Sequence, residues 1–441
     1  MGILTNLKSL YKQDSIRSVA IYTFTNFFGK SASFLLLVIF TNPYYISPAE
    51  NGLLSLFSNS LLLMMPFLSM GIIHSTNTEF FKSGQVEFKN LFTTGFIMPI
   101  AVMFLSCLFL FSFKKQLNVH FGFPAVFIWL IPFITFLIFC HDQLLNLLRN
   151  KYDTRLYLKV NLTKVILELG ISLILVVFFA WHWQGRITGL FMAYVIITIY
   201  AFYYFHKNGY LFGRVDMKYI YSELVYAIPI IAFQVSTFCM GSSDRFFLSG
   251  FTYDNNETVG IYNVAATFGS IIIILCTAVL QYLFPKIYSE LTQKQVNYTV
   301  IKKGFKIYAG VMLTGMLLIM FLIPVAYRFF INEKYYSGLK YVFILCSGYF
   351  LWTMSYFFFS FLFYYKEKKK ILILSCCCIF FSLVFNYFFI KQWSTMGAAL
   401  ANICTYIIVL IITLFFTRPY WIHFFSTDNT AKFGNKLNEI L

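Results

Sequence analysis

The sequence predicts an all-α, polytopic membrane protein whose chain crosses the bilayer about twelve times. Hydrophobic residues make up 59% of the 441 residues and charged residues only 12%, about half the charged share of soluble domains. The mean hydropathy is +0.72. Apolar runs of about 20 residues, the length that a helix needs to cross a hydrocarbon core of about 30 Å, recur along the whole chain.

Twelve such runs define the expected spans. They are apolar on all sides, which favours helices over the alternating strands of a membrane barrel. None of the connections between them is long enough to form a separate soluble domain. The expected limits of the spans are 18–41, 52–78, 90–113, 121–147, 160–181, 187–205, 222–250, 259–285, 307–327, 341–365, 371–390 and 396–417.

The net charge of +17 is explained by where the basic residues lie. With the N-terminus inside the cell, the expected cytoplasmic segments hold 24 Lys and Arg residues and the outer segments hold 7. Because basic residues accumulate on the cytoplasmic side of membrane proteins, the sequence predicts that both termini are cytoplasmic. The same distribution favours contact with anionic membrane lipid over binding to nucleic acid.

The sequence contains no pattern for a metal site, a cofactor or a catalytic centre. Nine cysteines fall in apolar runs, with neither a C-x-x-C spacing nor paired histidines. A Walker A phosphate loop, H-E-x-x-H and G-x-S-x-G are all absent. We therefore expect a protein that binds no metal or cofactor and is not an enzyme.

Two pairs of glycines indicate an internal repeat. Gly52 follows an acidic residue at the start of the second span, and Gly260 does so at the eighth; the two are 208 residues apart. Gly189 and Gly397 follow a tryptophan at the sixth and twelfth spans and are again 208 residues apart. Glycine also commonly opens a helix after a tight turn, which is the alternative explanation.

A parallel repeat of this kind predicts two lobes of six helices each. The N-terminal lobe would comprise residues 1–210 and the C-terminal lobe residues 211–441. Transporters built from two such halves commonly bind their substrate between them.

Four segments give the chain a family resemblance. Val19–Asn26 leads to Lys30 in the first span, and Ser47–Leu53 crosses the following outer turn. In the second half, Ser243–Leu248 leads to Glu257–Tyr262. With its length, span count and short loops, the chain resembles the Wzx-type O-antigen and polysaccharide flippases of the MOP exporter superfamily. That superfamily also contains the MATE drug exporters and the peptidoglycan lipid flippases.

The resemblance implies a fold and a function. Two six-helix lobes would enclose a V-shaped central cavity in the bacterial plasma membrane. The protein would move an undecaprenyl-pyrophosphate-linked oligosaccharide from the inner to the outer leaflet by alternating access, driven by the substrate gradient or an ion gradient. Glycan polymerase and assembly proteins would be its partners.

Ionisable residues within the spans are the candidate functional residues, since each costs about 2.5–3.5 kcal/mol at mid-helix. Lys30 lies near the middle of the first span, where it would face the pyrophosphate or pair with a carboxylate of another helix. Arg245 would face the central cavity or extend to the interface, and Asp244 would cap a turn or couple ions. Neighbouring helix positions point about 100° apart, so we expect these two side chains not to pair.

Lys164 and Glu168 stand one turn apart on the fifth span. They would form a structural ion pair, or they would take part in transport, with Lys164 attracting the anionic substrate and Glu168 exchanging a proton. Asp142, beside His141 near the inner end of the fourth span, could face this pair and couple transport to ions.

Two amides are candidates for sugar contacts. Asn26 in the first span and Gln234 in the seventh occupy corresponding positions of the two lobes. Each would bond sugar hydroxyls or bridge neighbouring helices.

Two other functions stay open. A MATE-like drug or cation antiporter would favour an acidic cavity, whereas the charges expected within the spans are mixed. A membrane polysaccharide polymerase or ligase would carry a large outer loop, whereas the outer connections expected here are short.

Overall fold

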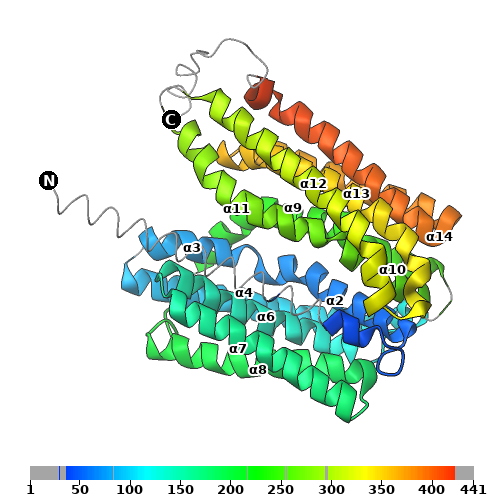
Figure 1. The fold of residues 1–441 in the computed structure, drawn as a ribbon. Coiled ribbons are helices and arrows are strands. Elements are labelled where there is room, and N and C mark those ends of the chain that lie inside the picture. Colours follow the sequence, from blue (N-terminus) through cyan, green and yellow to red (C-terminus); the bar gives the residue numbers. More distant parts are fainter. Residues whose placement is uncertain are drawn as a thin grey trace. The chain divides into compact units, whose positions relative to one another are not determined.

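The protein is an all-helical, multi-pass membrane protein (Figure 1). A computed structural model describes residues 29, 36–82, 84–215, 217–252, 254, 256–293 and 296–422. These divide into two compact units: the first runs to Val235 and includes Thr252–Gly260, and the second comprises Ser236–Phe251 and the chain from Ile261 onward. The units group residues by packing and not by span order, so the lobe limits expected at 210 and 211 stay a prediction.

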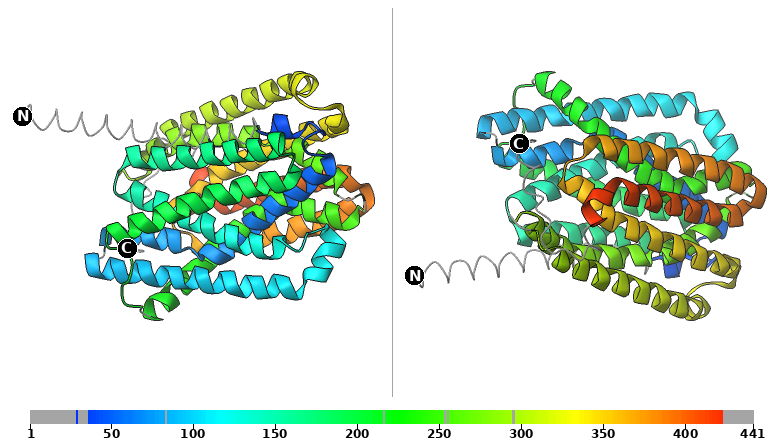
Figure 2. Two further views of the ribbon diagram at one scale, coloured as in Figure 1. Left: turned by 90° about the horizontal axis from the view of Figure 1, so that it is seen from below. Right: turned by 90° about the horizontal axis from the view of Figure 1, so that it is seen from above.

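The first unit packs its helices around one central helix. Its elements are α2 Pro48–Ser69, α3 Ile72–Lys82, α4 Gln85–Ser112, α5 Lys114–Phe121, α6 Phe127–Asn150, α7 Thr154–Leu173, the π-helix η1 Ile174–Phe178 and α8 His182–Lys207. Helix α6 contacts α2, α3, α4, α7 and α8, and α7 lies along α8 (Figure 2). Apolar side chains of α2, α4, α6 and α8 form the core of this unit.

Local sequence signals set the start of α2. The Ser47 hydroxyl accepts a hydrogen bond from the Glu50 amide, and the Glu50 carboxylate accepts one from the Ser47 amide. This reciprocal capping box satisfies two backbone donors at the helix start, and Pro48 at the first helical position needs no partner for its nitrogen. The segment that contributes to the family resemblance is therefore also a helix-start signal.

The second unit contains the end of α9 and the helices that follow. Its elements are α9 Met217–Phe251 from residue 236, α10 Glu257–Gly269 from residue 261, α11 Ile271–Leu291, α12 Tyr298–Phe330, the 3-10 helix η2 Glu333–Gly338, α13 Leu339–Tyr364 and α14 Lys368–Trp421. Helix α13 lies along α14, and α11 packs on α12 and α13 (Figure 1). Helix α14 is two helices joined at Ser394, whose φ of 48° and ψ of −126° are not helical.

The described helices account for most of the expected spans. Nine of them are long and apolar enough to cross a membrane, among the residues that the structure describes, and the last of the nine is the jointed α14. The expected first span, 18–41, lies almost entirely outside the described residues. The total of twelve therefore stays a prediction.

Two expected spans are interrupted. The run over 52–78 is divided into α2 and α3, because Met70 and Gly71 adopt left-handed backbone angles with φ of 43° and 70°. The run over 259–285 is divided into α10 and α11 at Ser270. Hydropathy cannot reveal the break at Ser270, because α10 and α11 are both strongly apolar, whereas α3 is clearly more polar than α2.

The repeated glycines of α2 and α10 make one reciprocal contact in the first unit. A side chain on Gly52 would collide with the backbone oxygen of Asn256, and a side chain on Gly260 would collide with that of Pro48. Asn256 lies four positions before Gly260, and Pro48 lies four positions before Gly52. Two copies related by a two-fold axis make reciprocal contacts of this kind. The two glycines that are 208 residues apart in sequence therefore have equivalent surroundings in space.

The other repeated glycines also make equivalent contacts. Gly189 brings α8 against Ser172 at the end of α7, and Gly397 brings the second part of α14 against Phe389 in its first part. In both units a glycine thus lets the last two spans approach closely. The absence of a side chain is what permits the short distance, as at other close helix contacts in membranes.

We expect Gly260→Ala to lower the stability of the folded protein by about 1–3 kcal/mol, because the new methyl group must displace the backbone at Pro48. Thermal unfolding of the purified protein in detergent checks this. Gly250→Ala in α9 is the matched control, since nothing lies within 4 Å of its added carbon. The control should unfold at an equal or higher temperature, because alanine favours helix by up to about 1 kcal/mol. Equal unfolding temperatures for both variants would contradict the close contact.

Candidate functional site

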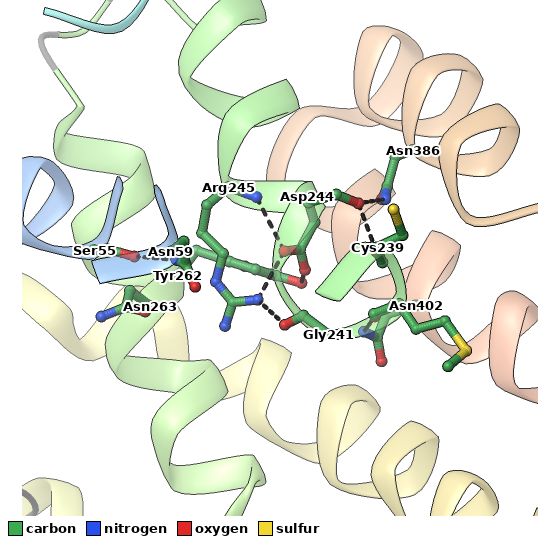
Figure 3. A network of polar contacts seen from close by, with 12 residues as sticks. Ser55, Asn59, Cys239, Gly241, Asp244, Arg245, Tyr262, Asn263, Asn386 and Asn402 are labelled. Atoms are coloured by element: carbon green, nitrogen blue, oxygen red, sulfur yellow. Dashed lines mark hydrogen bonds and ion pairs between the residues drawn. The ribbon is translucent and has the colours of Figure 1, made fainter. Parts of the chain in front are cut away.

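The second unit contains a buried charged cluster where α9 and α10 meet (Figure 3). Asp244 is 2% exposed, Arg245 is 6% exposed and Tyr262 is fully buried. An Arg245 Nη1 nitrogen lies 2.7 Å from Asp244 Oδ1, and the Tyr262 hydroxyl donates to Asp244 Oδ2 at 2.6 Å. Both carboxylate oxygens are therefore paired, as a buried charge requires.

The expectation that Asp244 and Arg245 do not pair is wrong. Their Cα–Cβ bonds do diverge, but the long Arg245 side chain folds back along α9 far enough to reach its neighbour and the Gly241 carbonyl. The Arg245 backbone amide also donates to Asp244 Oδ1 at 3.0 Å. Helix geometry fixes the direction of the Cα–Cβ bond, but it does not fix the end of a long side chain. Four rotatable bonds allow the arginine guanidinium to reach the adjacent residue.

Side chains of α14 hold the backbone of α9 just before this cluster. Ser382 donates to the Cys239 carbonyl at 2.6 Å, and Asn402 donates to the Met240 carbonyl at 3.1 Å. Asn386 donates to the Ser243 hydroxyl at 3.0 Å. Both parts of the jointed α14 thus bond the same turn of α9, which fixes the position from which Arg245 extends (Figure 3).

A cavity of about 290 Å³ lies beside Arg245 within the second unit. Residues of α9, α10, α11, α13 and α14 line it. They are Thr237, Met240, Gly241, Arg245, Ala266, Thr267, Ser270, Ile273, Tyr349, Trp352 and Tyr406. The cavity combines one buried cation, three hydroxyl-bearing small side chains and three aromatic rings.

The first unit contains a second charged cluster, between α7 and α8. Glu168 is 7% exposed, and its carboxylate lies 2.7 Å from both Lys164 Nζ and an Arg186 nitrogen. Arg186 also donates to the Ser172 hydroxyl at 3.1 Å. Two cations therefore share one carboxylate, and the ionised cluster has a net positive charge.

Tyr194 of α8 connects this cluster with the neighbouring His141 and Asp142. The Lys164 ammonium lies 4.5 Å from the centre of the Tyr194 ring, a cation–π contact. The His141 ring meets Tyr194 edge-on at 5.6 Å, and its Nδ1 lies 3.2 Å from Asp142 Oδ1. The Lys164–Glu168 pair and the His141–Asp142 pair therefore both adjoin the Tyr194 ring, which lies between them.

Three expected functional residues remain outside these clusters. Lys30 and Asn26 lie outside the described residues, so their expected roles stay predictions. Gln234 of α9 is half-buried, and its side-chain oxygen has no hydrogen-bond partner within the described part of the chain. A missing partner is compatible with either expected role, a sugar contact or a bridge between helices.

The sequence did not reveal two of the cluster residues. Arg186 stands 18 positions after Glu168 at the start of the next span, and Tyr262 stands 18 positions after Asp244. These two pairs of spans are not equivalent in the 208-residue repeat, so the sequence carried no signal for either residue. Among the described residues, no three His, Cys, Asp or Glu side chains come close enough to hold a metal ion; the expected absence of a metal and cofactor stays a prediction.

Solved transporter structures, two of them described as members of the MOP superfamily, have a similar fold. The lipid II flippase MurJ in an inward closed conformation has a TM-score of 0.71 at 14% identity, over 90% of this chain and 87% of that one. An inward-facing multidrug resistance MATE transporter has a TM-score of 0.69 at 15% identity, over 89% and 96%. A MOP superfamily transporter from Pyrococcus furiosus, described as having a binding pocket of reverse polarity, has a TM-score of 0.63 at 14% identity, over 93% and 96%.

The family follows from the sequence comparison. The family model described as "Polysaccharide biosynthesis protein" matches residues 15–291, so the chain belongs to this family of the MOP superfamily. No curated protein matches the chain. The family resemblance noted in the sequence is therefore confirmed at the level of family and superfamily.

We expect Glu168→Gln to be more destabilising than Arg186→Met. Removing the carboxylate leaves two partly buried cations without a counter-ion, at a cost on the order of 3 kcal/mol. Removing Arg186 leaves the Lys164–Glu168 pair intact. Thermal unfolding in detergent measures the difference, and the exposed Lys159 of the same helix provides a neutral control as Lys159→Gln. The reverse order would show that the two cations do not depend on Glu168 as their counter-ion.

In the second unit, Asp244→Asn should be more destabilising than Tyr262→Phe. The first change leaves the buried Arg245 without a counter-ion, at a cost of about 3–5 kcal/mol. The second removes one hydrogen bond to a carboxylate, at about 1.5–3 kcal/mol. Unfolding temperatures of the purified variants check the order. A smaller loss for Asp244→Asn would mean that Arg245 finds another counter-ion.

Proposed function

We propose that the protein is a flippase that moves undecaprenyl-pyrophosphate-linked oligosaccharide units across the bacterial plasma membrane by alternating access. The observation that carries this proposal is the family match over residues 15–291, because the family is defined by polysaccharide biosynthesis. The MOP fold supports it, since both lipid flippases and exporters have that fold. The glycan would serve O-antigen or lipopolysaccharide assembly, with a glycan polymerase among the partners.

The cations within the spans would attract the anionic substrate. Lys30 of the first span would face the pyrophosphate. Lys164 belongs to a cluster with a net positive charge, since its carboxylate partner is shared with Arg186. Arg245 lines a cavity of the second unit and would contact the glycan there. Asn26 and Gln234 would bond sugar hydroxyls.

Of the three acids proposed for ion coupling, Asp142 has the surroundings that favour this role most. Glu168 is held between two cations, and Asp244 has both oxygens paired. The Asp142 side chain is 40% exposed, and in the described part of the chain its one ion-pair partner is the imidazole of His141. An acid must be reachable from water in order to exchange an ion, so coupling through Asp142 requires the least rearrangement.

The remaining features of the proposal follow from composition. The positive-inside distribution supports a cytoplasmic location of both termini. The absence of a catalytic motif supports transport without chemical change of the glycan. A drug or cation antiporter is the alternative function, since MATE transporters have the same fold; a polysaccharide polymerase or ligase is less well supported because the expected outer connections are short.

Deletion of the gene is expected to trap complete undecaprenyl-linked oligosaccharide units in the inner leaflet. Lipid-linked intermediates would be extracted from the deletion strain, and a membrane-impermeable lectin or glycosidase applied to spheroplasts would report the leaflet. Plasmid-borne wild-type protein is the control and should restore surface glycan. Normal surface glycan together with altered drug tolerance would instead identify the antiporter. Units that are complete but not lengthened, and exposed on the outer leaflet, would identify a polymerase.

A further inference from the structure

We infer that the cavity of the second unit is a subsite for one uncharged sugar ring of the transported glycan, and not for its pyrophosphate. The inference rests on the proposed function and specifies which part of the substrate this cavity takes. Its size, its charge and the direction of its hydrogen bonds all support a neutral ring.

The size of the cavity limits its occupant. Ligand pockets usually measure about 300–1,000 Å³, so a volume of about 290 Å³ is at the lower end and fits one ring better than an oligosaccharide. The exposed Thr237 of α9 lies at its edge, whereas Tyr349 and Tyr406 lie buried at its inner wall. A ring at one point of the glycan would enter past Thr237, while the rest of the glycan remains outside.

The charge of the cavity argues against an anionic occupant. Among the described residues that line the cavity, Arg245 is the only ionisable cation, and Asp244 neutralises it at 2.7 Å. The Arg245–Asp244 pair is buried, so its two charges largely cancel within the low-dielectric interior. A pyrophosphate would have to leave water without gaining a net opposite charge, which is unfavourable.

The hydrogen-bonding groups match hydroxyls. The Thr267 hydroxyl donates to the Asn263 carbonyl at 2.8 Å, and the Ser270 hydroxyl donates to the Thr267 carbonyl at 2.8 Å. Both oxygens therefore present acceptor lone pairs to the cavity. Arg245 Nε is buried without a partner within the described residues and presents a donor.

This mixture of acceptors and a donor selects between ligands. A sugar hydroxyl both donates and accepts, so it can satisfy Thr267, Ser270 and Arg245 together. A phosphate or carboxylate oxygen only accepts, so Thr267 and Ser270 could donate to it only by giving up their present hydrogen bonds to the Asn263 and Thr267 carbonyls. Each hydrogen bond given up in this way reduces what binding an anion would gain.

Aromatic rings provide the apolar wall that the C–H face of a pyranose needs. Tyr349 and Trp352 stand one turn apart on α13, and Tyr406 faces them from α14. The Trp352 and Tyr406 ring centres are 5.8 Å apart, and those of Tyr349 and Tyr406 are 5.9 Å apart. Hydroxyl-bonding groups and a continuous aromatic surface thus occupy the same small cavity.

Saturation-transfer NMR on the purified full chain in detergent tests the subsite. The probes are methyl glycosides of glucose, galactose, N-acetylglucosamine and rhamnose, with glucuronate and inorganic pyrophosphate as anionic competitors. We expect at least one neutral glycoside to receive saturation at its ring C–H protons and to remain bound in the presence of excess pyrophosphate. Displacement by pyrophosphate, preference for glucuronate or absence of any glycoside signal would each overturn the inference.

Variants locate the signal in the cavity. Thr267→Val preserves shape and should weaken glycoside binding on the order of tenfold, the equivalent of about one hydrogen bond. Trp352→Leu should weaken it at least as much, while the half-exposed Trp393 outside the cavity serves as the matched control in Trp393→Leu. Because Thr267→Val does not alter the aromatic wall, it keeps the test valid if Trp352→Leu fails to fold. Unchanged binding by a folded Thr267→Val protein would remove the cavity from the binding site.

Export in the complemented deletion strain separates this inference from the proposed function. If the deletion strain traps lipid-linked units and Thr267→Val restores only part of the export, both stand. If the deletion traps units but Thr267→Val and Trp352→Leu export as well as the wild type, the subsite is wrong and the flippase stands. If the deletion traps no units, the proposed flippase function fails, and binding of neutral glycosides then belongs to a different transport activity.

Discussion

The cost of placing charge in a membrane is the constraint on which the rest of the structure depends. Each ionisable side chain within a span requires about 2.5–3.5 kcal/mol of compensation, and both described clusters provide it with direct partners. Asp244 binds Arg245 and Tyr262, and Glu168 binds Lys164 and Arg186. One partner in each cluster, Tyr262 of α10 and Arg186 of α8, comes from a neighbouring helix, so compensation of charge also fixes how those helices pack.

The two clusters both compensate a buried carboxylate, but they differ in net charge. In the second unit one cation meets one carboxylate, and the pair is neutral. In the first unit two cations meet one carboxylate, and the cluster is positive when ionised. An anionic pyrophosphate is bound best by surroundings of net positive charge, as in the first unit, whereas an uncharged sugar ring is bound best by neutral surroundings, as in the second. The proposed division between charge attraction and ring recognition follows from this difference.

Close packing at glycines complements the charged clusters. Gly52 and Gly260 contact each other's helix turns reciprocally, and Gly189 and Gly397 bring the last two spans of each half together. In lipid, helices gain little from hydrophobic contact with one another, so short backbone distances and polar side chains determine their association. The four glycines of the expected repeat thus all lie at close helix contacts.

The sequence by itself determined the class of protein, the approximate limits of the described spans and the Lys164–Glu168 pair, because hydropathy and helical spacing are properties of neighbouring residues. Tertiary structure decided what depends on distance in space and on side-chain reach. It paired Asp244 with Arg245, added Arg186 and Tyr262 from the following helices, and formed a cavity from five helices. It also divided two expected spans, one at Met70 and the other at Ser270. Interactions between neighbouring residues determine where helices form, whereas contacts between residues distant in sequence depend on which helices the fold packs together.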